Sequence, residues 1–449
     1  MTYIPHTDAD REAMLKAIGA ASLNDLFDAV PADQRFPKLN IPAGLSEMET
    51  AWEVGGLAQA NASAGEYAIF LGAGAYHHFS PSVVNHILLR GEFYTAYTPY
   101  QPELSQGTLQ AIFEYQSMMC ALTGMEAANA SHYDGATSLA EAVTLVNAHF
   151  RGKRTKVILS PSVNPMYRAV ARSYHQNSGM KFVGDKGSAT IPDLIDMLDK
   201  DTAMIVVQYP NFFGQIDELG GIATAAHNAG ALLCIVTDPI ALGLFKSPGE
   251  LGADVVVGEG QSLGIPLSYG GPYLGFFATK MDYVRKIAGR VVGETVDKSG
   301  RRAFVMTLRP REQDIRREKA TSNICTNQGL MALAACVYMS TMGKHGLRKV
   351  AELCYHKAHY AAQEINKIDG YSVELSKPFF KEFVVKCPKP VHEINDVLIE
   401  HWGIIGGYDL ARDYETRANQ MLIAVTEMNT KDEIDTLVEA LRDAKSHSH

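Results

Sequence analysis

The pattern of hydrophobic and polar positions divides the chain into three parts. Residues 1–65 have helical periodicity interrupted by prolines, and Ser46 with Glu49 forms a capping box that is typical of a helix start. Residues 66–325 alternate short apolar runs with amphipathic stretches. Residues 326–449 begin with long helical stretches and continue with strands mixed with helices. The pattern predicts a helical N-terminal arm, a large domain and a smaller C-terminal domain.

The short apolar runs of the middle part predict the strands of a sheet. They are rich in β-branched residues and lie at 156–159, 203–208, 232–236, 255–257 and 274–278. Near-continuous apolar strands separated by helices are typical of a mostly parallel sheet that is covered on both faces. We therefore expect a doubly wound α/β fold for residues 66–325 and an α+β fold for residues 326–449.

Composition and charge narrow the class of protein. Hydrophobic residues make up 46% of the 449 residues, so the chain can bury a large core, and a mainly disordered state is excluded. The formal net charge of −9 disfavours a nucleic-acid-binding protein. The apolar runs are too short for a bilayer-spanning helix, which needs about 20 such residues. We expect a globular protein that binds neither nucleic acid nor membrane.

The cysteines and histidines do not indicate a metal site. None of the six cysteines has a partner at Cys-x-x-Cys spacing, and most of them lie in apolar stretches. His77 and His78 are adjacent, and neighbouring side chains of an extended segment point to opposite faces. The first residues lack the apolar core of a secretory signal. We expect free thiols, no bound metal and a cytoplasmic location.

Polar residues at the predicted carboxyl ends of the strands form a first candidate site, because ligands of open α/β sheets bind there. Asp238 directly follows the strand 232–236, where it can either face a ligand or form a turn before Pro239. Asp134 and Gly135 precede a predicted helix. The N–H groups at Gly135 can bind a phosphate group, or Asp134 can simply cap the helix.

A strand with an Asp at its end, followed by a second strand and a Gly-rich loop, resembles the layout of fold-type I pyridoxal-phosphate enzymes. That resemblance implies an Asp that pairs with the pyridine nitrogen and a Lys that forms a Schiff base. The lysine position falls on Gln261 or Ser262, and neither side chain can form a Schiff base. The resemblance therefore implies a vestigial cofactor site that comprises Asp238, Gln261, Ser262 and Gly135.

An ordered set of motifs along nearly the whole chain resembles one family. The segments are FLGAGAY at 70–76, YTAYTPYQPELSQG at 94–107, LTGM at 122–125, NAS at 129–131, YDGAT at 133–137 and SNICTNQ at 322–328. Together they resemble the P-protein of the glycine cleavage system. The match is to its N-terminal half, which some prokaryotes make as a separate subunit.

The resemblance implies an oxidoreductase of glycine catabolism that works as a two-subunit complex. A partner, subunit 2, would hold pyridoxal phosphate on its own lysine, while this chain would carry no covalent cofactor. The complex, an α2β2 heterotetramer, would decarboxylate glycine and transfer the aminomethyl group to the lipoyl arm of the H-protein. This chain alone would be inactive.

Two segments are candidates for contact with the partner's active site. The first is a proline-broken loop rich in hydroxyl groups and aromatic rings, which either contributes to the partner's catalysis or forms only an interface wall; its residues are Tyr97, Thr98, Tyr100 and Gln101. The second lies between the two domains and, as related folds imply, reaches across the interface toward the cofactor phosphate, or else caps the following helix; its residues are Thr321, Ser322 and Asn323.

Two other functions remain open from the sequence. The chain could be an inert scaffold or regulatory subunit that contributes no residue to an active site. It could instead be a self-sufficient pyridoxal-phosphate enzyme, such as an aminotransferase, that uses an unexpected lysine. The absence of a lysine at positions 261 and 262 disfavours this last alternative.

Overall fold

The structure is a computed structural model that describes residues 5–446 and forms two compact units, Met1–Ala62 and Ser63–His449. Within the described residues, no helix is both long and apolar enough to cross a lipid bilayer. The three predicted domains stay a prediction, although the end of the first unit lies close to the expected end of the N-terminal arm.

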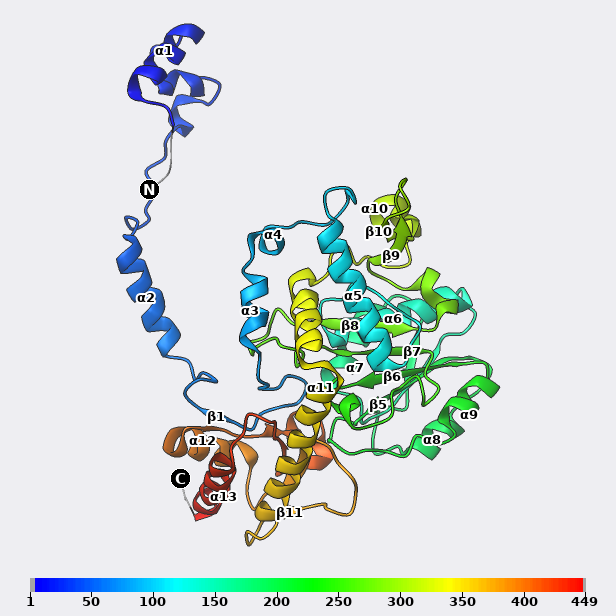
Figure 1. The fold of residues 1–449 in the computed structure, drawn as a ribbon. Coiled ribbons are helices and arrows are strands. Elements are labelled where there is room, and N and C mark those ends of the chain that lie inside the picture. The colour runs from blue at the N-terminus through cyan, green and yellow to red at the C-terminus, as the bar shows by residue number, and fades with distance from the viewer. Residues whose placement is uncertain (1–4, 447–449) are drawn as a thin grey trace. The chain divides into compact units, whose positions relative to one another are not determined.

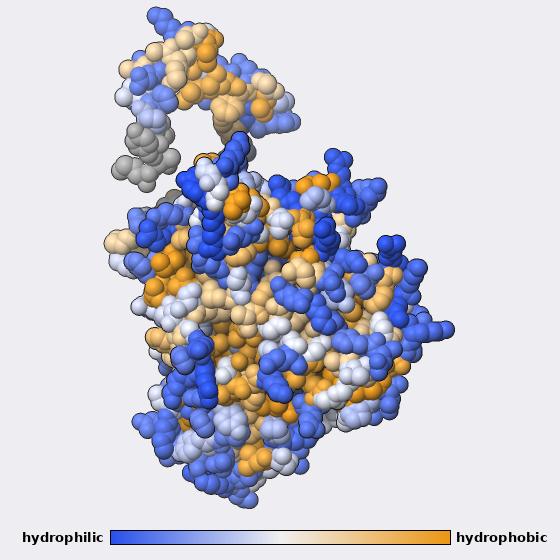
Figure 2. Space-filling model, turned by 45° about the vertical axis from the view of Figure 1, so that its right-hand side comes forward, coloured by the Kyte–Doolittle hydropathy of each residue, from blue (hydrophilic) through white to orange (hydrophobic). Residues whose placement is uncertain are grey.

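The N-terminal unit is helical, as expected. It contains α1 (Asp8–Ile18), α2 (Glu47–Gln59) and two short 3₁₀ helices at Leu23–Phe27 and Ala32–Gln34. The Ser46 and Glu49 capping box is present at the start of α2. None of these elements buries a side chain, and Figure 2 shows hydrophobic residues on the surface of this unit.

The second unit is built on a central sheet that contains seven strands within the described residues (Figure 1). In spatial order they are β2 (Ala127–Ala128), β8 (Gly275–Thr279), β7 (Val255–Glu259), β6 (Leu232–Thr237), β5 (Thr202–Tyr209), β3 (Lys156–Leu159) and β4 (Lys181–Val183). Strands β7, β6, β5, β3 and β4 run parallel, and β8 is antiparallel to both of its neighbours. The five predicted strands are confirmed within a few residues.

The sheet is covered on both faces, which confirms the doubly wound α/β fold. Along β5, Ile205 and Val207 enter one hydrophobic core while Met204 and Val206 enter another, as the alternation of side chains on a strand requires. The helices that accompany the sheet are α3 (Ser82–Leu88), α4 (Gly91–Tyr94), α5 (Gln106–Thr123), α6 (Gly135–Phe150), α7 (Pro165–His175), α8 (Ile191–Asp196) and α9 (Ile222–Asn228).

A β-hairpin that the sequence pattern did not reveal packs on α5. Strands β9 (Val291–Val296) and β10 (Arg302–Thr307) pair antiparallel, and Val292 and Phe304 form a small core with Leu109 of α5. The short helix α10 (Gln313–Arg316) follows this hairpin. The strands mix polar with apolar residues, so they lack the continuous apolar run of the central strands.

A long helix, α11 (Gly329–Ile365), connects the sheet to the C-terminal part (Figure 1). Its backbone is kinked at Gly343, where φ is 56°. The helix begins only at Gly329, because the preceding segment is held in place by tertiary hydrogen bonds. Ser131 accepts one from the N–H of Gln328, and Arg290 donates one to the carbonyl of Cys325.

The C-terminal part forms an α+β layer with its own hydrophobic core. Its strands are β11 (Ser372–Val373), β12 (Glu382–Lys386), β15 (Gln420–Ala424) and β14 (Tyr408–Asp409), and α12 (Val391–Trp402) and α13 (Lys431–Ser446) complete it. Strand β1 (Ala68–Ile69) pairs with β13 (Ile404–Ile405), and Phe70 joins the same core. Residues 68–70 therefore pack with the C-terminal part and not with the large domain to which we assigned them.

Candidate functional site

The proposed vestigial site lies at the carboxyl ends of β6 and β7, next to the start of α6. Asp238 follows β6, Gln261 and Ser262 follow β7, and Gly135 is the first residue of α6. The structure joins Gly135, Gln261 and Asp238 into one network through further side chains, whereas Ser262 is buried beside it. The most important of the joining side chains are Glu259 and Lys381.

The N–H groups that could bind a phosphate at the start of α6 are already used. Asp134 caps the helix, because its carboxylate accepts from the N–H of Thr137 at 2.7 Å. The carboxylate of Glu259 accepts from the N–H of Gly135 at 3.0 Å. The same carboxylate also accepts from the N–H groups of Gln261 (2.9 Å) and Leu274 (2.8 Å). Of the two alternatives for Asp134, helix capping is therefore the one observed.

Burial raises the pKa of Glu259 to about 7, against the opposing effect of its N–H donors. A Cβ atom on Gly135 would lie 2.1 Å from the hydroxyl of Tyr167 and 2.9 Å from the backbone nitrogen of Glu259. Only glycine fits at this close approach. The start of α6 is thus packed tightly around the Glu259 carboxylate.

Asp238 pairs with a lysine that is distant in the sequence. The ammonium group of Lys381, which precedes β12, lies 2.6 Å from the Asp238 carboxylate. The Lys381 side chain is only 2% exposed, and its Nζ lies 3.5 Å from the centre of the Tyr76 ring. The other carboxylate oxygen of Asp238 accepts from the N–H of Ile240, so Asp238 also forms the expected turn.

Gln261, one of the two expected positions of the missing lysine, is 1% exposed. Its amide donates to the carbonyl groups of Tyr76 and Ile265 and accepts from the N–H of Tyr76. These bonds fasten the segment 72–78 over the site. Glu382 reinforces the attachment, because it accepts from the N–H of Ala73 (2.7 Å) and from the hydroxyl of Tyr76 (2.8 Å).

The remaining space at the site does not fit pyridoxal phosphate. The cavity lined by Tyr76, Asp238 and Glu259 has a volume of about 30 Å³, which is room for one or two water molecules. Gln261 offers an amide and no amine, the Glu259 carboxylate already uses the N–H of Gly135, and the Lys381 ammonium contacts Asp238, the expected partner of the ring nitrogen. The residues of this chain therefore do not match that cofactor at this site.

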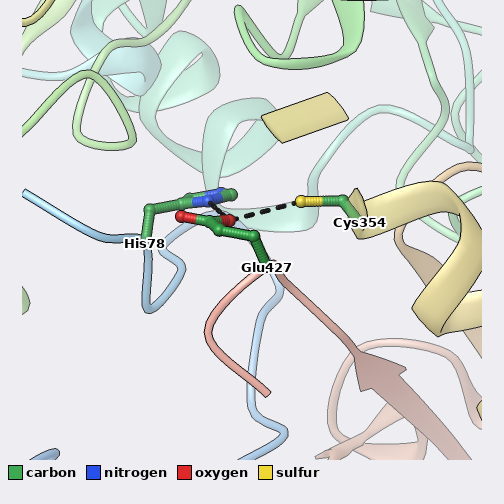
Figure 3. A group of neighbouring side chains, drawn as sticks. All are labelled: His78, Cys354 and Glu427. Carbon is green, nitrogen blue, oxygen red and sulfur yellow. Dashed lines mark hydrogen bonds and ion pairs between the residues drawn. The ribbon is translucent and has the colours of Figure 1, made fainter. Parts of the chain in front are cut away.

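A second cluster, formed by His78, Glu427 and Cys354, borders the same region (Figure 3). His78 contacts Glu427 through Nδ1 at 2.7 Å and Lys381 through Nε2 at 2.9 Å. The thiol of Cys354 donates to Glu427, and burial raises the pKa of this thiol. Burial alone would raise the pKa of Glu427, but the hydrogen bond from His78 lowers it to about 2. Because both ring nitrogens of His78 are engaged and Lys381 adds a cation, the cluster is a hydrogen-bonded network ill suited to a metal ion.

The two segments expected at the partner's active site lie together at another place on the same unit. Arg290, which is 8% exposed, donates to the side chain of Asn327 and to the carbonyl of Cys325, both at 2.9 Å. Its guanidinium also lies 5.9 Å from the ring centre of Tyr100. The guanidinium of Arg309 lies 5.0 Å from the same ring centre. Arg290 therefore links the loop 94–102 to the segment 321–328.

The loop 94–102 presents its aromatic side chains to the surface. Tyr97 is 87% exposed, Tyr100 and Gln101 are exposed, and Thr98 is half-buried. Tyr97 and Thr98 line a groove of about 350 Å³ whose lining also includes Thr326 and Asn327. Such exposure of large side chains in one loop is typical of a surface that contacts another molecule.

The segment 321–323 does not cap a helix, since α11 begins later and its N-cap is Gln328. Thr321 and Ser322 line a small groove that they share with Arg290 and Arg311. The hydroxyl of Ser322 donates to Glu141 at 2.9 Å, and Asn323 is exposed. The alternative expectation of a helix cap is therefore wrong.

Three residues that shape these sites escaped the sequence analysis: Glu259, Lys381 and Arg290. Glu259 ends an apolar strand, and Lys381 follows two phenylalanines and directly precedes β12. The sequence does contain a signal for Glu259 and Lys381, because a charged residue next to a buried apolar run needs a polar partner in the fold. Arg290 precedes the hairpin that the pattern did not reveal.

Comparisons with known proteins identify the family of this chain. Residues 1–441 match the family model for the glycine cleavage system P-protein. A probable glycine dehydrogenase (decarboxylating) subunit 1 of Thermomicrobium roseum is 55% identical, with 99% of this chain and 100% of the relative covered. The protein of the same name in Geobacillus kaustophilus is 52% identical, with 98% of each chain covered.

Solved structures agree with this family and show the fold. A crystal structure of the glycine decarboxylase (P-protein) of the glycine cleavage system, in inhibitor-bound form, has a TM-score of 0.91 at 44% identity, covering 99% of this chain and 100% of that one. A sphingosine-1-phosphate lyase of Burkholderia pseudomallei has a TM-score of 0.67 at 15% identity over 93% and 95% of the two chains, and shares the fold. The fold is that of the fold-type I pyridoxal-phosphate enzymes. This chain belongs to the glycine cleavage system P-protein family, whose enzyme is glycine dehydrogenase (decarboxylating).

Proposed function

We propose that this chain is the subunit of the glycine-decarboxylating P-protein that does not hold pyridoxal phosphate, and that it completes the active site of a cofactor-bearing partner subunit. The pair would assemble as an α2β2 heterotetramer, bind glycine and pass the aminomethyl group to the lipoyl arm of the H-protein. The observation that carries the proposal is the closed site at Asp238 and Gln261, where this chain has neither a lysine anchor nor space for the cofactor.

The location of the cofactor on the partner follows from the chemistry that this chain lacks. Pyridoxal phosphate, when bound, supplies an electron sink for the loss of a carboxylate group. It needs an amine for attachment, and Gln261 offers only an amide, already bonded to Tyr76 and Ile265. The nearby amine of Lys381 contacts Asp238, the expected partner of the ring nitrogen. That nitrogen and the carbon that forms a Schiff base lie at opposite ends of the ring, so Lys381 is at the wrong end.

The contribution of this chain to the partner's site rests on the two segments joined by Arg290. Hydroxyl groups on the loop 94–102 can donate hydrogen bonds to an anionic substrate, and the aromatic rings can exclude water from it. Thr321 borders the groove that contains Arg290 and Arg311, whose positive charge suits an anionic group such as a phosphate. The competing function, an inert scaffold, requires that none of these side chains affects turnover.

The test uses the reconstituted two-subunit complex with lipoylated H-protein. Tyr97→Phe, Tyr100→Phe and Thr321→Val each remove one hydroxyl group. If the hydroxyl group binds more tightly in the transition state, its loss lowers turnover by about 10²–10³-fold, while the complex elutes intact in size-exclusion chromatography.

Tyr174→Phe is the matched control, because Tyr174 is an exposed tyrosine on α7, outside both segments. We expect this control to retain turnover and assembly. Turnover within about twofold of the unaltered complex for all three test variants, a change too small for a lost transition-state hydrogen bond, would establish the scaffold function instead. Weakened assembly with normal turnover per complex would assign the loop to the interface alone.

A further inference from the structure

We infer that this chain closes its own cofactor site with two of its side chains, Glu259 and Lys381, which take the places that the phosphate group and the ring nitrogen occupy in the fold family. This inference deepens the proposed function, because it states what prevents cofactor binding besides the absent lysine. A carboxyl group and an ammonium group of this chain would then occupy the places of the cofactor's phosphate group and protonated ring nitrogen.

Glu259 stands in for the phosphate. A phosphate at the start of a helix is held by backbone N–H groups and by the helix dipole. Here the Glu259 carboxylate accepts from three backbone N–H groups at 2.8–3.0 Å, and one of them belongs to Gly135, the first residue of α6. An incoming phosphate would have to displace a carboxyl group that is covalently part of the chain and already accepts from these donors.

Lys381 stands in for the ring nitrogen. A protonated pyridine nitrogen presents one positive N–H to the carboxylate below it. The ammonium of Lys381 presents a positive N–H to Asp238 at 2.6 Å, and the Tyr76 ring lies 3.5 Å from this ammonium. Lys381 is buried, and His78 is its other close partner, at 2.9 Å. The pair Asp238 and Lys381 therefore has a neutral total charge in a place where an unpaired carboxylate would be costly.

The segment 72–78 holds this arrangement closed. Gln261 bonds to both backbone groups of Tyr76, and Glu382 holds Ala73 and the Tyr76 hydroxyl. Restoring a lysine at position 261 would therefore leave the carboxylate, the ammonium and the closed segment in place.

The first test asks whether emptying the Glu259 position creates an anion site. The purified full chain, without its partner, is dialysed against radiolabelled inorganic phosphate at constant ionic strength set with chloride. We expect no bound phosphate for the unaltered chain and about one equivalent per chain for Glu259→Ala, with a melting temperature that rises by about 1–3 °C as phosphate is added. Glu259→Ser serves the same purpose if the alanine variant is poorly folded.

Glu126→Ala is the matched control, because Glu126 also accepts from a backbone N–H, that of Met281, but lies outside the site. It should bind no phosphate. Phosphate binding by the unaltered chain, or its absence from both Glu259 variants, would overturn the inference. Neither result touches the proposed function, which is tested separately by the turnover of the hydroxyl variants and by the search for a pyridoxyl-lysine on this chain.

The second test concerns the ion pair. Lys381→Met leaves the Asp238 carboxylate without its cation, and Asp238→Asn leaves a buried ammonium. We expect both single variants to melt well below the unaltered chain, and the double variant to melt above Lys381→Met. Melting temperatures that decrease additively would show that the two side chains are not coupled, and would overturn the replacement of the ring nitrogen by Lys381.

Discussion

At the scale of single residues, Arg290 connects the two segments that we propose to contact the partner's active site. Its fork of donors reaches Asn327 and the carbonyl of Cys325, and its guanidinium lies over the ring of Tyr100. A lysine has a single ammonium group and cannot make both bonds in one plane. Arg290 therefore acts as a positioning residue for two segments that are far apart in the sequence.

We predict that Arg290→Met and Arg290→Lys both lower turnover of the complex by at least about tenfold, since each loses geometry that only the guanidinium provides. The KM for glycine should rise as well, because the loop that we propose to face the substrate would lose its support. Arg302→Met, on the exposed hairpin strand β10, is the control and should change neither value. A normal KM with normal turnover for Arg290→Lys would show that its charge suffices.

Glu141 is a second informative residue, because its carboxyl group is buried and only partly bonded. One oxygen accepts from Ser322 at 2.9 Å, and the other has no hydrogen-bond partner. Burial raises its pKa from 4.5 to about 7. A carboxyl group with a raised pKa holds a proton in the folded state that the unfolded chain releases, so stability falls as pH rises between these two values.

We predict that Glu141→Gln is more stable than the unaltered chain at pH 8, by on the order of 1–3 kcal/mol. The difference should shrink as pH falls toward 4.5, the ordinary pKa of the group. Denaturant unfolding of both chains at several pH values measures it. Glu103→Gln, the same chemical change at an exposed residue, is the control. An equal difference at all pH values would contradict the raised pKa.

At the scale of elements, α11 packs in two hydrophobic cores, and the change of core falls after its kink. Ala335 before the kink and Cys354 after it both pack in the core beside the central sheet, whereas Ala361 and Ile365 pack in the C-terminal core. At Gly343 the backbone has φ 56° and ψ −176°, a combination that side chains strongly disfavour. A Cβ atom there would meet no atom within 4 Å. Any cost of a side chain is therefore backbone strain.

We predict that Gly343→Ala lowers the free energy of unfolding by about 1–3 kcal/mol. Gly329→Ala is the control, because a Cβ atom there also meets nothing within 4 Å and the backbone has no positive φ. It should be neutral or slightly stabilising, since alanine favours helices. Equal stability of the two variants in urea unfolding would show that the strain at Gly343 is relieved elsewhere.

At the scale of the whole molecule, the chain should be inactive and free of covalent cofactor when purified alone. Borohydride reduction in the presence of pyridoxal phosphate, followed by peptide mass mapping, should find no stoichiometric pyridoxyl-lysine. Gln261→Lys should not gain activity on its own, because Glu259 and Lys381 remain in the site. A stoichiometric adduct on any lysine of the unaltered chain would favour the self-sufficient enzyme.

The sequence by itself determined the family, the central strands, the helix caps and the missing lysine. Each of these is a local signal: an apolar run, a Ser and Glu three residues apart, an amide where a lysine is required. Such signals can be read from the sequence because they depend only on residues that are close together along the chain.

Only the tertiary structure decided how the site is closed. Glu259 reaches Gly135 across 124 positions, and Lys381 reaches His78 across 303. It likewise placed Phe70 in the C-terminal core and joined the loop 94–102 to the segment 321–328 through Arg290. Contacts between distant segments leave no periodic pattern in the sequence. The partners of Glu259 and Lys381 are therefore decided only when the sheet and the C-terminal layer pack together.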